Sequence, residues 1–216
     1  SVKRSTKHRE KRKLFRSYSF TAEYEDNITV ELFVEYDKDK RKDFVKAENE
    51  AKLFAHMYGQ MPHFLKIYNK KIYIHNDIDG DESPNSNGLW WAEIQKKEFH
   101  INTIRDKNGY NRCGEKKRYS RCTLTMVHEL AHIIDPGAGT IKPAQWEKAR
   151  RLDKKKFASE YAKTNSDEDF AESMVSWIVV RHKSDKISKS DVVKFEKFIP
   201  NRFKLFDEMN FNVYPL

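Results

Sequence analysis

Residues 128–132 read His-Glu-Leu-Ala-His, and these residue types at this spacing could bind and use a metal ion. On an α-helix, residues four apart lie on one face, so the imidazoles of His128 and His132 can reach a single ion. Glu129 lies about 100° further round the helix, from where its carboxylate can reach a water on that ion. Zinc suits such a site, because it binds neutral imidazole and keeps a position for a water whose pKa it lowers to ~7. We therefore expect one Zn²⁺ per chain, with Glu129 as the general base that later passes the proton to a leaving amine.

A catalytic zinc ion takes a third ligand from the protein. The extended pattern HExxHxxGxxH is excluded, because Asp135 and Ala138 occupy the positions of its glycine and third ligand. Glu168 and Glu172 are four residues apart and therefore share one face of a later predicted helix. One of them could bind zinc, while the other accepts a hydrogen bond from a ligand imidazole and so fixes its tautomer. Spacing alone does not decide which carboxylate does which.

The elements that must position these residues are predicted as helices. In the predicted helix over 121–135, the apolar residues share one face (Leu124, Val127, Leu130, Ala131 and Ile134). Helical patterns cover 121–135, 144–162, 166–182 and part of 189–198. The third pattern opens with Ser166 and Asp169, which predict a capping box. Asp135 could either orient an imidazole or simply end the first helix.

The first half of the chain is predicted to mix strands with one helix. We expect a helix over 44–58 and strands within 28–36, 67–75, 88–94 and 97–104. Of Trp90 and Trp91, one should face the core and the other should be partly exposed, because neighbouring strand residues point to opposite faces. The loop 77–88 departs from a calcium-binding loop at its turn glycine and its bidentate glutamate, so we interpret it as a plain loop. This order predicts an α+β fold, with a small N-terminal mixed sheet and helix followed by a mainly helical C-terminal half that carries the metal site.

The net charge of +9 over 216 residues is concentrated at the N-terminus. Residues 1–20 contain eight Lys or Arg and one Glu, whereas the remainder is nearly neutral. We expect 1–20 to form a basic, flexible tail and 21–216 to form a single domain, which we expect to be a monomer. The tail could contact nucleic acid or an anionic surface, or could be the remnant of a pro-segment or linker. No run approaches the ~18 apolar residues of a membrane span.

The two cysteines, Cys113 and Cys122, are compatible with one disulfide or with two free thiols. The other histidines lack ligand-like spacing, and we interpret them as structural or surface residues; they include His56, His63, His75 and His100.

The stretch from Tyr161 to Glu172, which follows the HExxH helix, carries the pattern Y-x6-E-x3-E. In this it resembles the gluzincin zinc metallopeptidases, in the branch that contains the anthrax lethal factor catalytic domain and the small secreted bacterial Pro-Pro endopeptidases. The resemblance covers residues 121–182 and implies a zincin-like fold. It implies that Tyr161 stabilises the oxyanion, that Glu168 is the third zinc ligand and that Glu172 supports the site. The chain departs from the family at Ala131, where a glycine is usual. The substrate-binding residues of the family have no match in this chain.

We therefore predict a zinc-dependent endopeptidase that hydrolyses peptide bonds in a protein or peptide. Tyr110 and Tyr119 are weaker candidates for the role of Tyr161. We expect the protein to be secreted or delivered outside the producing cell, and Ser1 leaves room for a cleaved leader. The alternative is a binding protein with a structural or vestigial zinc site, whose basic tail contacts nucleic acid or anionic membrane.

Overall fold

The computed structural model describes residues 2–5, 15–37, 44–75, 90–102, 112–134, 141–154 and 156–216. The chain divides into two compact units. Residues 1–60 and 66–126 form the first, which we call the sheet unit. Residues 61–65 and 127–216 form the second, the helical unit. The division falls within one helix, α3 (Lys116–Ile134), so His128 and every later candidate site residue belong to the helical unit.

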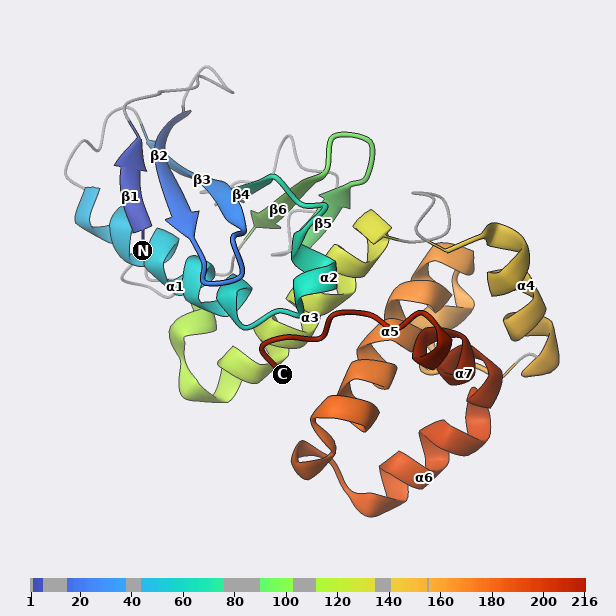
Figure 1. The fold of residues 1–216 in the computed structure, drawn as a ribbon. Helices are drawn as coiled ribbons and strands as arrows, with labels where there is room; N and C mark the ends of the chain where they lie inside the picture. Colours follow the sequence, from blue (N-terminus) through green and yellow to red (C-terminus); the bar gives the residue numbers. More distant parts are fainter. Residues whose placement is uncertain are drawn as a thin grey trace. The chain divides into compact units, whose positions relative to one another are not determined.

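Within the described residues, the sheet unit contains a six-stranded mixed sheet in the order β1-β2-β3-β4-β6-β5 (Figure 1). The strands are β1 (Val2–Ser5), β2 (Phe15–Glu23), β3 (Thr29–Asp37), β4 (Lys71–His75), β5 (Trp90–Glu93) and β6 (Glu98–Asn102). β3, β4 and β6 are parallel, whereas the pairs β1–β2, β2–β3 and β5–β6 are antiparallel. The mixed sheet and the strands predicted from 28 onward are confirmed.

One face of this sheet is apolar and packs against α1 (Phe44–Gly59), which contacts β1, β2 and β3. Its buried side chains alternate along the strands, as the period of two requires (Leu32, Val34, Ile72, Ile74, Phe99 and Ile101). Phe54 of α1 meets Trp90 edge to face, with ring centroids 5.8 Å apart. Trp90 is buried and Trp91 is half-buried, which confirms the expectation for this pair.

The N-terminal residues differ from the expected tail. Residues 2–5 form β1 and residues 15–20 begin β2, so both stretches are hydrogen-bonded into the sheet. Ser17, Tyr18, Ser19 and Phe20 are buried, although they lie at the end of a basic segment. These residues pair with β3, and this pairing holds them in the sheet. The charge of the segment alone does not predict it. Residues 6–14, and the loop at 77–88, lie outside the described residues.

The helical unit contains α4 (Pro143–Leu152), α5 (Ser166–His182), α6 (Lys189–Phe198) and α7 (Pro200–Glu208). Short turns occur in this unit at Tyr161–Lys163 and Ser184–Lys186, whereas the turn Arg112–Gly114 lies in the sheet unit. A four-residue helix, α2, covers His63–Lys66. Helices α5 and α6 confirm the predicted ranges. α7 was not predicted.

The predicted helix 144–162 is wrong beyond Leu152. Lys154 has φ 54°, a left-handed conformation that ends a right-handed helix. The carboxylate of Asp153 accepts hydrogen bonds from the backbone N–H groups of Asn201 and Arg202, at 2.9 and 3.2 Å. The helix therefore ends where a contact distant in the sequence holds its last turn.

Helix α5 begins one residue earlier than the predicted capping box implied. Asn165 is its N-cap, and the Asn165 side chain accepts hydrogen bonds from the N–H groups of Asp167 and Glu168. Ser166 instead accepts a hydrogen bond from the Trp146 indole of α4. Phe170, Met174, Trp177 and Ile178 of α5 are buried. Phe170 packs against Trp146 and Phe206.

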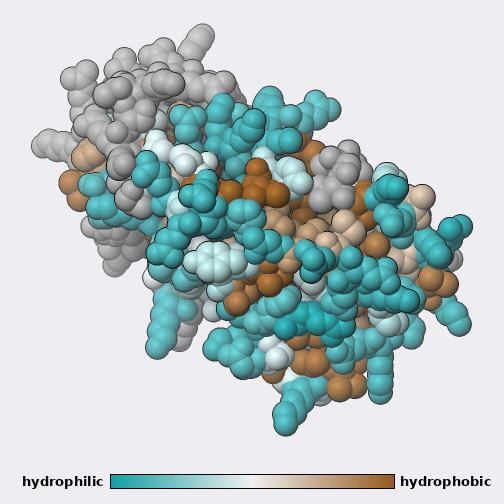
Figure 2. All heavy atoms as spheres, viewed as in Figure 1, coloured by the Kyte–Doolittle hydropathy of each residue, from teal (hydrophilic) through white to brown (hydrophobic). Residues whose placement is uncertain are grey.

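The described surface is mainly hydrophilic in the view of Figure 2, with smaller hydrophobic groups between the polar side chains. Among the described residues, no helix combines the length and the apolar character that a membrane span requires.

Candidate metal centre

The last turns of α3 bring His128 and His132 onto one side of the helix. Their Nε2 atoms lie 3.2 Å apart, and the two rings are nearly perpendicular. Most of the predicted apolar face, from Val127 to Ile134, is buried, and this packing fixes the direction of the imidazoles. Leu124 is the exception, since it is 42% exposed and does not belong to that face.

Helix α5 directs Glu168 at both imidazoles. Glu168 Oε2 lies 3.0 Å from His128 Nε2 and 3.4 Å from His132 Nε2. Three ligand-type atoms thus converge with mutual separations of 3.0–3.4 Å. Tetrahedral zinc with bonds of ~2.0–2.1 Å places its ligand atoms ~3.3 Å apart. Glu168 Oε2 is buried, and the two imidazole Nε2 atoms lie beside it. The donor set therefore fits a zinc ion.

Glu172, one turn further along α5, contacts the other side of the His128 ring. His128 Nδ1 donates a hydrogen bond to Glu172 Oε1 at 2.7 Å. With the proton on Nδ1, Nε2 carries the lone pair that a metal needs. The structure thus places Glu168 at Nε2 and Glu172 at Nδ1 of the same imidazole, a distinction that the spacing of the two glutamates left open.

Mutual attraction between these groups changes their pKa values in the metal-free protein. Burial lowers the pKa of His128, but its hydrogen bonds to Glu168 and Glu172 outweigh burial and raise the pKa from 6.5 to about 9. Burial raises the pKa of Glu168, but the two imidazoles outweigh it and hold the pKa far below its usual value. The pKa of Glu172 is also lowered, because hydrogen bonds from His128 and from the Ser159 hydroxyl outweigh burial. The centre therefore holds its carboxylates ionised, as metal ligands must be.

Tyr161 lies at the edge of this centre in the turn Tyr161–Lys163. Its hydroxyl donates to Glu168 Oε1 at 3.2 Å, and its ring centroid is 5.8 Å from that of His128. The side chain is 55% exposed, so it can meet a molecule that approaches from solvent. Burial and the nearby carboxylates raise the pKa of Tyr161 to about 12, so the phenol remains a proton donor at neutral pH.

Glu129 and the weaker candidates occupy different surroundings. Glu129 is half-buried, and its charge raises the pKa values of both His128 and Tyr161. The Tyr119 hydroxyl donates instead to Gln60 Oε1 at 2.9 Å within the sheet unit. Tyr110 and Asp135 lie outside the described residues.

A buried ionic network holds the start of α5, and sequence reasoning missed it. Asp169, next to Glu168, accepts hydrogen bonds from Arg150 of α4 at 2.8 Å and from Arg202 of α7 at 2.7 Å. Arg202 also donates to Asp153 at 3.0 Å, and these two side chains and Asp169 are almost fully buried. Breaking a buried pair of this kind costs several kcal/mol, so the network fixes the first turn of α5 firmly. Only the acidic start of α5 hinted at it in the sequence.

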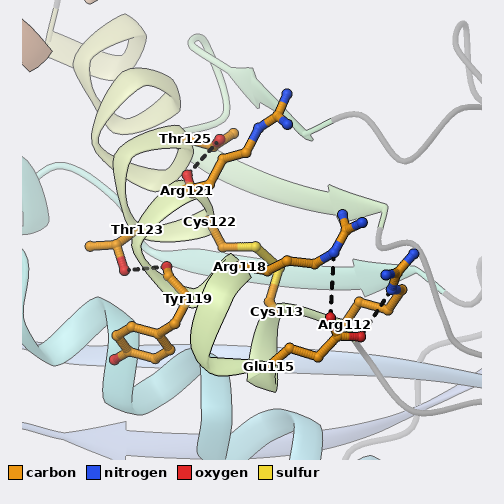
Figure 3. Close-up of a disulfide and its surroundings, with 9 residues drawn as sticks. All are labelled: Arg112, Cys113, Glu115, Arg118, Tyr119, Arg121, Cys122, Thr123 and Thr125. Atoms are coloured by element: carbon orange, nitrogen blue, oxygen red, sulfur yellow. Dashed lines mark hydrogen bonds and ion pairs between the residues drawn. A yellow bond between two sulfur atoms is a disulfide. The ribbon is translucent and has the colours of Figure 1, made fainter.

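A disulfide joins Cys113 to Cys122 in the sheet unit, so the cysteine pair is not two free thiols (Figure 3). Cys122 lies on α3, and Cys113 lies in the turn Arg112–Gly114 just before that helix. Arg112 and Arg118 both pair with Glu115 beside the disulfide. The cross-link therefore ties the beginning of α3 to the segment that leads into it.

No known protein family, curated protein or solved structure matches this chain.

Proposed function

We propose that the chain is a zinc-dependent endopeptidase of the gluzincin type. The observation that carries this proposal is the convergence of His128 Nε2, His132 Nε2 and Glu168 Oε2 to separations of 3.0–3.4 Å. Two helices supply these atoms, and the distances match those between the ligands of a tetrahedral ion. The resemblance of residues 121–182 to gluzincins supports the same ligand set.

His128, His132 and Glu168 would hold the zinc ion and would leave it accessible to a solvent molecule, as catalytic zinc sites do. When bound, the ion supplies Lewis-acid chemistry, which polarises a carbonyl and makes water acidic. Glu172 holds the Nδ1 proton of His128, and the Asp169–Arg202 network holds the helix that presents Glu168. These residues position the ligands before a substrate arrives.

Glu129 and Tyr161 supply the proton chemistry. Glu129 takes a proton from the attacking water as its oxygen bonds to the peptide carbon, and it gives a proton to the amine nitrogen as the C–N bond breaks. Tyr161 donates its hydroxyl hydrogen bond to the oxygen on which negative charge develops. Its raised pKa keeps that proton in place at neutral pH, and its exposure leaves it accessible to substrate.

The proposed substrate is a protein or peptide met outside the producing cell. The Cys113–Cys122 disulfide supports this location, because disulfides persist mainly in oxidising compartments.

A library of peptides from digested proteins, incubated with the zinc-loaded chain, tests the proposal. We expect cleavage that stops with a chelator and returns when zinc is restored. Glu129→Gln should retain one zinc in this site and lose at least 10²-fold in kcat. The matched control is Glu160→Gln, which changes a 90% exposed carboxylate close in sequence and should leave hydrolysis unchanged. Undiminished hydrolysis by Glu129→Gln would exclude Glu129 as the base, and no cleavage by a zinc-loaded wild-type chain would reject the peptidase.

A further inference from the structure

The helical unit contains a pocket at the C-terminal end of α4. Its volume is about 480 Å³, a size typical of sites that bind small molecules. Four of its lining side chains are cationic, one is acidic and one is aromatic (Arg150, Arg151, Lys154, Arg202, Glu147 and Phe157). The pocket shares none of these residues with the metal centre on α3 and α5. It is therefore a separate feature of the same unit.

The turn that follows α4 brings the lining residues together. Lys154 has φ 54° and ends the right-handed helix. Arg202 of α7, which packs beside α4 (Figure 1), donates to the Asp153 carboxylate and to the Lys156 carbonyl, at 3.0 Å each. Phe157 follows directly, and its ring centroid lies 5.7 Å from the guanidinium carbon of Arg202. Both sides of the turn are thus fixed to one buried arginine.

Two of the four cations are already paired with carboxylates. Arg202 and Arg150 both donate to Asp169 Oδ2, at 2.7 and 2.8 Å. Arg150 also donates to Glu147 at 2.8 Å, and Arg202 donates to Asp153. Two arginines therefore meet three carboxylates, so these contacts hold the guanidinium groups in place and leave no excess positive charge.

Arg151 and Lys154 supply the excess positive charge of the pocket. Both residues are exposed, and within the described part of the chain neither has a carboxylate partner. Together they turn the balance of charge around the pocket positive. An arginine presents a planar fork of donors to a phosphate group, and a lysine adds a compact point charge. This pair therefore favours a phosphate group over a neutral ligand.

Phe157 gives the pocket an apolar wall beside these cations. Its side chain is half-buried and lines the pocket together with Arg151 and Lys154. A free phosphate ion is far smaller than the pocket, so the remaining volume suits an organic group that packs against the ring of Phe157. The lining thus combines one surface for an anion with another for an apolar or aromatic group.

We propose that this pocket binds a small organic phosphate. The phosphate group pairs with Arg151 and Lys154, and the apolar or aromatic part of the ligand packs against Phe157. Arg150 and Arg202 stay bound to their carboxylates and form the fixed base of the site. The proposal does not depend on the peptidase proposal, because it uses other residues and needs no metal ion.

Isothermal titration calorimetry of the full chain with phenyl phosphate tests this proposal. We expect one saturable site per chain in the wild type. Arg151→Gln and Lys154→Gln should each weaken binding about tenfold, because each removes a charge-assisted hydrogen bond. Both residues are exposed, so the variants should fold, which circular dichroism checks. The matched control is Lys148→Gln, which removes the same charge from an exposed side chain of α4 outside the pocket and should bind like the wild type.

Two related probes test the two parts of the ligand. Inorganic phosphate lacks the ring and should bind about fivefold more weakly than phenyl phosphate. Phenol lacks the charge and should not bind measurably. Absence of saturable phenyl phosphate binding, or equal losses in Arg151→Gln and Lys148→Gln, would overturn the site. Phenol that binds as tightly as phenyl phosphate would overturn the role of the cations, and inorganic phosphate that does so would overturn the organic ligand.

A further variant separates this proposal from the peptidase proposal. His132→Ala should lose zinc and hydrolysis but keep the wild-type Kd for phenyl phosphate, because His132 does not line the pocket. Loss of phenyl phosphate binding in His132→Ala would place the phosphate on the zinc ion and would overturn the proposal. A chain that binds phenyl phosphate through Arg151 and Lys154 but cleaves no peptide would reject the peptidase alone.

Discussion

Replacing Glu172 should weaken zinc binding without removing a ligand. Glu172 Oε1 accepts the Nδ1 proton of His128 at 2.7 Å, a short, charge-assisted hydrogen bond that holds Nε2 free for the ion. Hydrogen bonds to a charged partner contribute about 1.5–3 kcal/mol, and loss of such a partner behind a metal ligand typically costs about 10- to 100-fold in affinity. We therefore expect Glu172→Ala to raise the zinc Kd about 100-fold.

Glu172→Gln keeps an acceptor oxygen at nearly the same place and loses only the charge. We expect this variant to raise the Kd about tenfold and so to recover part of the loss seen in Glu172→Ala. A role limited to packing would leave Glu172→Gln with the wild-type Kd, since glutamine and glutamate are similar in size. Glu160→Gln, on an exposed carboxylate that pairs with Lys163, should leave the Kd unchanged.

Competition with a chromophoric zinc chelator measures each Kd, and circular dichroism confirms that each variant is folded. A folded Glu172→Ala protein with a wild-type Kd would refute the orienting role of Glu172. A glutamine variant no better than the alanine variant would refute the hydrogen bond as its cause.

Three further predictions concern other parts of the molecule. Tyr161→Phe should lower kcat about 10²-fold and leave zinc content and KM unchanged, as steady-state kinetics on a cleaved peptide would show. In metal-free protein the raised pKa of His128 stabilises the fold fully below pH 6.5, and this contribution of up to about 3 kcal/mol should be lost as pH rises through about 9. Urea unfolding of the wild type and of His128→Gln, with a chelator at pH 6 and at pH 10, measures this contribution to the free energy of unfolding. Replacing Cys113 and Cys122 by serine should lower the free energy of unfolding by about 3 kcal/mol, measured by urea titration.

Each of these has a contradicting result. An unchanged kcat would remove Tyr161 from the oxyanion role. An equal pH dependence in wild type and His128→Gln would remove the ion pair as the source of the effect. Equal unfolding midpoints with and without the cysteines would mean that the contacts of Arg112 and Glu115 suffice to hold this segment.

Local periodicity was enough to identify the residues that the proposed zinc centre brings together. His128 and His132, like Glu168 and Glu172, are four residues apart, and a helix converts that spacing into a shared face without help from the rest of the fold. The ranges of α5 and α6 were predictable for the same reason. The end of α4 was not, because Asp153 is held by residues 48 and 49 positions later.

The sequence by itself therefore determined which residues of each helix share a face, and with them the four side chains of the proposed zinc centre. Only the tertiary structure decided which carboxylate meets which ring nitrogen, because that depends on how α3 and α5 lie against each other. The same holds for His75 and His100, which are 25 residues apart and carry no recognisable spacing. Parallel pairing of β4 with β6 brings them together, and strand register is set by contacts distant in the sequence. Residues that share a helix face lie three or four positions apart in the sequence. A sheet face combines strands that can be far apart in the sequence, and the local sequence does not predict which strands pair.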